Sequence, residues 1–216
     1  SADVTRKRRW RAIPQMLFPQ TGGFDADFAL RDDEPVLQRL QQAFGNVNIE
    51  DLRLPLRVTT TDASTGQRVV LRKGPLVQAL RASIALPFMF APVQIDGRRL
   101  IDGFIADPLP VSAARDARAV LALGFESPMP RRIDGPSRLL AQVTSALTNN
   151  LMQARLAEAG ADGRCVLSLV PTLTRRVGLF DTDAMPDLVE AGRRVAHDHL
   201  PQIRALLQRS SHRVAA

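Results

Sequence analysis

Residues 80–110 strongly restrict the local structure that this chain can adopt. Two short strand-like runs, residues 93–95 and 99–101, are separated by three residues that begin with the dipeptide Asp96-Gly97. Asp-Gly is a strong signal for a two-residue hairpin turn, because both central positions of the favoured turn take a positive φ angle. The sequence therefore predicts a tight hairpin whose second arm ends at Asp102.

Asp102 is a candidate catalytic residue because of where this hairpin would place it. A carboxylate at a strand end, followed by Gly103 and preceded by a small-residue helix and a Pro-rich turn, could be held rigidly enough for chemistry. The same pattern also occurs in ordinary turns, where the aspartate has only a structural role. Spacing alone leaves both roles open.

The same segment resembles the patatin-like phospholipase family. Residues 83–87, Ser-Ile-Ala-Leu-Pro, are similar to the Ser-x-Ala-x-Pro run that ends a helix in that family, and residues 90–92 are similar to its Phe-x-Pro turn. Asp102-Gly103 then matches the pair whose aspartate is half of a Ser–Asp catalytic dyad. The resemblance extends over most of residues 36–200. It implies an α/β, three-layer patatin-like fold with a mostly parallel central sheet, and hydrolysis of lipid esters with Asp102 as general base.

The chain departs from the family pattern at several points. Phe104 stands where a small residue is usual, and we expect it to narrow the pocket or line an acyl channel. Asp107 stands where asparagine is frequent, and its place before a proline favours a structural role.

The sequence contains neither the Gly-x-Ser-x-Gly elbow nor the Gly-rich oxyanion loop that the family needs. Ser83 lacks flanking glycines and is not expected to be the nucleophile. The resemblance therefore implies a fold incomplete at its N-terminal side, a companion N-terminal segment that carries the serine, and no activity for this chain alone.

Strand and helix patterns interleave along the chain, which favours an α/β architecture in one domain spanning residues 1–216. Strands are predicted over residues 54–60, 68–72, 119–124 and 165–170, and the continuous apolar run 119–124 is typical of a strand buried on both faces. Helices are predicted to begin at residues 32–35 and 74–75, to fill residues 136–159, and to begin again near residues 185–186.

The N-terminal segment, residues 1–30, is predicted to be irregular, basic and aromatic. The net charge of the chain is +7, and six consecutive residues concentrate part of it: Arg6, Lys7, Arg8, Arg9, Trp10 and Arg11. This run favours either an ordinary solvated surface or contact with an anionic membrane. The alternative to an enzyme is accordingly a catalytically silent α/β domain that binds an anionic membrane surface or other anionic partner through this run. Nucleic acid is not expected, because aromatic residues make up only 5% of the chain and no reading helix is recognisable.

No cofactor or metal site is predicted. Cys165 is the only cysteine and lies in a strand-like run, which favours a small buried apolar role. His197 and His199 are two residues apart, so on a helix they point to different faces and do not form a paired metal site. We expect no signal peptide and no membrane-spanning apolar run within these 216 residues, while the first residue is not Met and a segment upstream of Ser1 stays open. We expect a cytoplasmic or membrane-peripheral protein.

Overall fold

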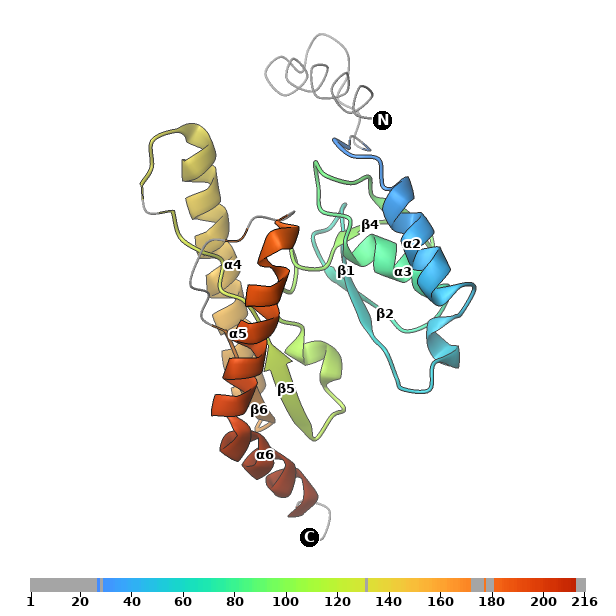
Figure 1. The fold of residues 1–216 in the computed structure, drawn as a ribbon. Helices are drawn as coiled ribbons and strands as arrows, with labels where there is room; N and C mark the ends of the chain where they lie inside the picture. The colour runs from blue at the N-terminus through green and yellow to red at the C-terminus, as the bar shows by residue number, and fades with distance from the viewer. Residues whose placement is uncertain (1–26, 28, 131, 172–176, 178–180, 213–216) are drawn as a thin grey trace. The chain divides into compact units, whose positions relative to one another are not determined.

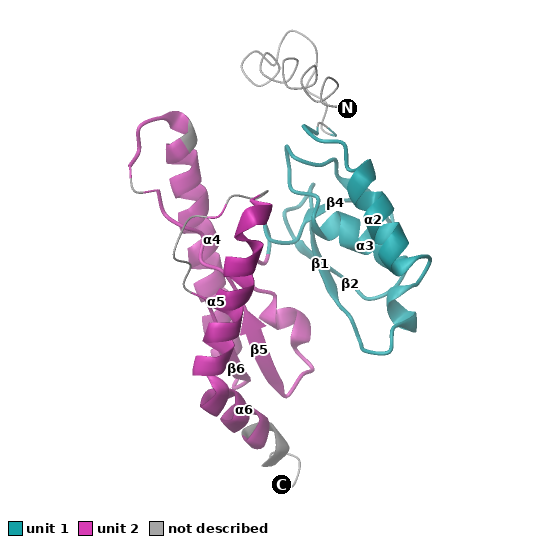
Figure 2. Ribbon diagram, viewed as in Figure 1, with its two compact units in different colours: residues 1–106 teal, residues 107–216 magenta. Residues whose placement is uncertain are grey.

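The computed structural model describes residues 27, 29–130, 132–171, 177 and 181–212. The chain divides into two compact units, residues 1–106 and residues 107–216 (Figure 2). Most of the predicted irregular segment 1–30, including the basic run, lies outside the described residues. Helices and strands occur in both units, which confirms the α/β class. The prediction of one domain over the whole chain stays a prediction.

A four-stranded antiparallel sheet with helices forms the first unit (Figure 1). The strand order is β2-β1-β4-β3. The elements, in chain order, are α2 (Glu34–Phe44), the 3₁₀ helix η2 (Ile49–Asp51), β1 (Val58–Asp62), β2 (Arg68–Leu71), α3 (Leu76–Ser83), β3 (Val93–Ile95) and β4 (Arg98–Asp102).

The predicted hairpin is present as β3 and β4. Asp96 and Gly97 take φ angles of 50° and 74°, as a two-residue turn of this type requires. A second hairpin joins β1 to β2, and its turn is closed by the Asp62 carboxylate, which accepts the backbone N–H groups of Ser64 at 2.8 Å and Thr65 at 3.2 Å. Short turns of this kind can connect only antiparallel strands, so this sheet is not parallel.

Among the predicted strands, the first one differs most from its prediction. The strand expected at residues 54–60 begins only at Val58 and continues to Asp62. Leu54 is 80% exposed, and Pro55 has no N–H to give to a strand ladder. The alternating pattern before Val58 therefore does not produce a strand.

Helix α3 supplies the core of the first unit. Its buried residues are Leu76, Val77, Ala79 and Ala82. Two apolar clusters form on them: one joins α3 to Ile49 and Val58, the other to Val93 and Leu100. Arg81 of α3 also forms a 2.6 Å ion pair with Asp33, just before α2. Beyond α3 the chain turns back to β3 and β4.

The second unit contains a parallel strand pair. Its elements are the 3₁₀ helix η3 (Val111–Ala114), β5 (Ala119–Leu123), α4 (Pro136–Ala161), β6 (Cys165–Leu169), the 3₁₀ helix η4 (Thr182–Ala184), α5 (Met185–Asp198) and α6 (Leu200–His212). Helix α4 is the crossover between β5 and β6, and a crossover is what a parallel pair needs. Parallel pairing, expected for most of the sheet, is thus found in β5 and β6, whereas the first unit is antiparallel.

The core of the second unit lies between α4 and one face of the strand pair. It contains Leu109, Val111, Ala122, Met152 and Ala159. The prediction that β5 is buried on both faces is wrong for this chain by itself. Leu121 is 44% exposed and Leu123 is 68% exposed, while Ala122 between them is buried.

Helix α4 is 26 residues long, which exceeds the length needed to cross a bilayer. Among the residues that the structure describes, however, no helix combines that length with sufficient apolar character.

Candidate active site

Asp102 is the last residue of β4 and lies opposite Thr60 of β1. Its backbone N–H donates a 3.0 Å hydrogen bond to the carbonyl oxygen of Ala85, just beyond the end of α3. This bond joins the two sequence motifs, because Ala85 lies in the run 83–87 and Asp102 begins the Asp-Gly pair. The strand end is therefore fixed from β1 on one side and from the end of α3 on the other.

Ser83 is the last residue of α3, and its hydroxyl is used in the scaffold. Its Oγ donates a 2.9 Å hydrogen bond to the carbonyl oxygen of Thr59 in β1. The bond ties the helix end to the sheet. The bond thus gives Ser83 a structural role. That Ser83 is not the nucleophile stays a prediction.

The Asp102 side chain is half-buried, and its carboxylate has one local donor. Oδ1 accepts the backbone N–H of Phe104 at 2.9 Å. Burial raises the pKa of the Asp102 carboxyl above its ordinary value, and the Phe104 hydrogen bond opposes part of that rise. A carboxylate with a raised pKa is a stronger base than an exposed aspartate. The group is thus suited to accepting a proton.

Thr61 supports the turn after Asp102, and the sequence reasoning did not identify it. Thr61 is buried, and its Oγ donates to the Asp102 carbonyl oxygen at 2.8 Å and accepts the Ala106 N–H at 3.2 Å. The sequence does contain a pattern that could have pointed to Thr61: three consecutive threonines, residues 59–61, occupy a strand that was predicted to be buried. A buried hydroxyl has to find a partner.

Gly103 follows Asp102 because no other residue fits there. A Cβ atom at this position would lie 2.3 Å from the carbonyl oxygen of Thr59 and 2.6 Å from its carbonyl carbon. Glycine is therefore required by close approach of two backbone segments. Phe104, next in the chain, is 43% exposed. Its predicted part in a pocket or an acyl channel stays a prediction.

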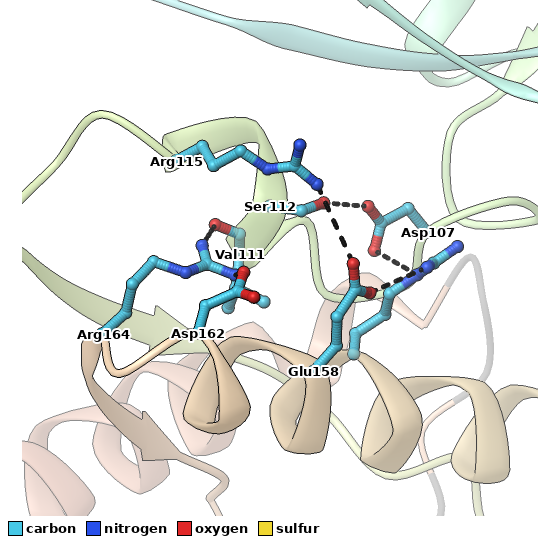
Figure 3. A network of polar contacts seen from close by, with 8 residues as sticks. Asp107, Val111, Ser112, Arg115, Glu158, Asp162 and Arg164 are labelled. Carbon is cyan, nitrogen blue, oxygen red and sulfur yellow. Dashed lines mark hydrogen bonds and ion pairs between the residues drawn. The ribbon is translucent and has the colours of Figure 1, made fainter.

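Asp107 belongs to a polar network in the second unit (Figure 3). Its side chain is fully buried, accepts the Ser112 hydroxyl at 3.3 Å, and lies 3.8 Å from Arg155 Nε. Arg155 also pairs with Glu158 at 3.1 Å, and Arg115 reaches Glu158 at 3.8 Å. The network links the start of the unit to α4 and is consistent with the structural role expected for Asp107.

Cys165, His197 and His199 all lie in the second unit. Cys165 is partly buried in β6. His197 is exposed in α5, and the Nδ1 atom of His199 lies 2.8 Å from the Val195 carbonyl oxygen at the helix end. Within the described ranges, no group of three His, Cys, Asp or Glu residues could hold a metal ion.

Comparison with known proteins shows which protein sequences this chain resembles. The profile of a family described as patatin-like phospholipase matches residues 2–115, which include Asp102 and its supporting contacts. An uncharacterised NTE family protein of Mycobacterium tuberculosis is 41% identical over 90 residues, or 42% of this chain and 25% of the relative. A Mycobacterium bovis protein of the same description gives the same values.

A second NTE family protein of Mycobacterium tuberculosis, also uncharacterised, is 34% identical over 73 residues, or 34% of this chain and 12% of the relative. The matched part of the chain thus spans a quarter or less of the length of these relatives.

Proposed function

Because the chain belongs to the patatin-like phospholipase family, a family of lipid acyl hydrolases, we propose that it supplies the aspartate of a Ser–Asp dyad that hydrolyses lipid esters. The observation that carries this proposal is the position of Asp102. It lies at the end of β4 in an Asp-Gly pair that resembles the family's motif, half-buried, with its Oδ1 atom accepting the Phe104 N–H.

In the proposed reaction, Asp102 acts directly on the serine, without an intervening histidine. The carboxylate takes the proton of the serine hydroxyl as the serine oxygen bonds to the ester carbonyl carbon. The protonated Asp102 gives that proton to the departing alcohol, and an acyl-serine remains. Water, deprotonated by the same carboxylate, then attacks the acyl-serine. The bond between the acyl carbon and the serine oxygen breaks, the protonated Asp102 returns the proton to the serine oxygen, and the fatty acid is released. The raised pKa of Asp102 supports this role, because it brings the base nearer to the proton affinity that the step needs.

The serine and the oxyanion donors are proposed to lie on a segment outside these 216 residues. Two observations support this part of the proposal. The sequence contains no Gly-x-Ser-x-Gly elbow. The exposed apolar side chains of β5, Leu121 and Leu123, also offer a surface on which further elements of a larger sheet could pack. A compact monomer of the isolated chain with no tendency to associate would count against such a missing layer.

Labelling with a fluorophosphonate, which reacts with activated serines, tests the proposal. The complete gene product should be labelled on a serine outside these 216 residues and should hydrolyse a short-chain nitrophenyl ester. The isolated chain should show neither reaction, and Ser83→Ala should leave labelling of the complete protein unchanged. Labelling of the isolated chain at Ser83 would overturn the assignment.

We propose that the basic run, residues 6–11, contacts the membrane and so brings the enzyme to its substrate. If the domain is instead catalytically silent, this membrane contact would itself be the function. The proposal rests on the concentration of positive charge beside Trp10. Replacing Arg6, Arg8 and Arg9 by glutamine should weaken binding to anionic vesicles, since each nearby basic residue contributes about 1 kcal/mol at such a surface.

The weakening should fade as salt is added, because screening shortens the reach of the charges. Hydrolysis of a soluble ester is the control and should not change. Equal vesicle binding by the wild type and the triple variant would make the run an ordinary solvated surface.

A further inference from the structure

We propose that Thr61 is a positioning residue for Asp102, and that its hydroxyl sets the course of the chain from Asp102 to Ala106. This inference rests on the proposed function of Asp102 as a base. Thr61 itself would touch neither substrate nor serine. It would act by holding the turn that directs the Asp102 carboxylate.

The first step of the argument is that strand pairing ends at Asp102. The ladder between β1 and β4 pairs Asp62 with Leu100, Thr61 with Ile101 and Thr60 with Asp102. Beyond that last pair, the chain leaves the sheet. Its direction there depends on contacts other than the ladder.

The Thr61 hydroxyl makes two of those contacts. Its Oγ donates to the Asp102 carbonyl oxygen at 2.8 Å and accepts the Ala106 N–H at 3.2 Å. One buried hydroxyl therefore closes the turn at both ends. The other bond that closes this turn onto the Asp102 carbonyl oxygen, from the Ile105 N–H, is longer, at 3.4 Å.

The turn in question directs the carboxylate. Phe104, whose N–H donates to Asp102 Oδ1 at 2.9 Å, lies inside the Asp102–Ala106 segment. If the ends of the segment come loose, the Phe104 N–H moves and the carboxylate loses the donor that orients it. A displacement of about 1 Å in a catalytic group can lower a rate about 100-fold. The expected role of Thr61 is accordingly to set the geometry of Asp102.

The chain offers a matched control in the neighbouring residue. Thr60 is also fully buried in β1, but its Oγ donates to the Val69 carbonyl oxygen of β2 at 3.3 Å. Replacing either threonine by valine removes one buried hydroxyl from the same strand and keeps the shape of the side chain. Of the two hydroxyls, only that of Thr61 forms hydrogen bonds with the Asp102–Ala106 turn.

The functional test compares Thr61→Val, Thr61→Ser and Thr60→Val in the complete gene product, with Asp102→Asn as the inactive reference. Thr61→Val should lower kcat about tenfold to 100-fold with little change in KM, because binding groups are untouched. Thr61→Ser keeps the hydroxyl and should recover kcat to within about threefold of wild type, and Thr60→Val should behave like wild type.

The outcomes separate the two proposals. Wild-type activity in Asp102→Asn would refute the role of Asp102 itself. An inactive Asp102→Asn together with equal kcat values for Thr61→Val and Thr60→Val would refute the role of Thr61 alone.

A second measurement uses the 216-residue chain and needs no activity. Amide hydrogen exchange at Phe104 and Ala106 should become faster in Thr61→Val and stay near the wild-type rate in Thr60→Val. Unchanged exchange at both amides in Thr61→Val would overturn the inference. If Thr61→Val does not fold, Thr61→Cys takes its place in both measurements, since a thiol is only a weak donor and acceptor.

Discussion

Asp102→Asn is expected to lower kcat of the complete enzyme by about two to four orders of magnitude, the usual range for loss of a general base. Asparagine has the size of aspartate, and its Oδ1 atom can still accept the Phe104 N–H that now bonds to Asp102. It cannot take a proton from the serine. Steady-state kinetics with a soluble ester measures the loss.

The same substitution should not lower the melting temperature at neutral pH. Burial raises the pKa of Asp102, so the ionised carboxylate is less favourable in the folded state than in the unfolded state. The resulting loss of folding stability is present at pH values above the raised pKa that Asp102 has in the folded state. It disappears below the unfolded value of about 3.9, where both states are protonated. Asparagine avoids this cost, and the variant should match or exceed the wild-type melting temperature at pH 7 and lose any advantage in acid.

Asp96→Asn is the matched control for this experiment. It makes the same chemical change six residues earlier in the chain, at an exposed turn position. The φ angle of Asp96 is 50°, a conformation that asparagine adopts readily. Activity and stability should both stay near wild type. A large drop in melting temperature for Asp102→Asn would instead make Asp102 an ordinary turn residue.

Gly103→Ala is expected to lower the free energy of unfolding of the first unit by about 3 kcal/mol, the upper part of the range for forced overpacking. The added Cβ would lie 2.3 Å from the Thr59 carbonyl oxygen, which is backbone and cannot rotate away. That oxygen also accepts the Ser83 hydroxyl, so moving it would strain the attachment of α3. Urea denaturation, followed by hydrogen exchange at the amides of β1 and β4, measures the effect.

Gly192→Ala provides the comparison. Gly192 lies within α5, and a Cβ there would meet nothing within 4 Å. Alanine is the better helix former, so this change should leave stability unchanged or raise it by up to about 1 kcal/mol. If Gly103→Ala proved as stable as Gly192→Ala, the close approach of Thr59 to Gly103 would not restrict this position.

The sequence by itself determined the local elements that depend on neighbouring residues. Asp96-Gly97 predicted the hairpin of β3 and β4, because a two-residue turn needs positive φ angles that few residues adopt. The apolar runs predicted β5 and β6, and the helix predicted over residues 136–159 corresponds to α4. The short motifs around residues 83–87 and Asp102-Gly103 were enough to indicate the family.

Only the tertiary structure decided which partners these elements find. The sequence did not reveal that Thr61 bonds to the Asp102 turn, because 41 residues separate the two in the chain. The need for glycine at position 103 arises from Thr59, on another strand, and Asp107 forms an ion pair with Arg155, 48 residues further along the chain on α4. The apolar residues at 54–57 wrongly predicted a strand, and the apolar run of β5 wrongly predicted burial on both faces. Burial depends on what packs against a strand, which the local pattern does not show. Local patterns specify how a segment folds, whereas the site is assembled from contacts between segments that no local pattern encodes.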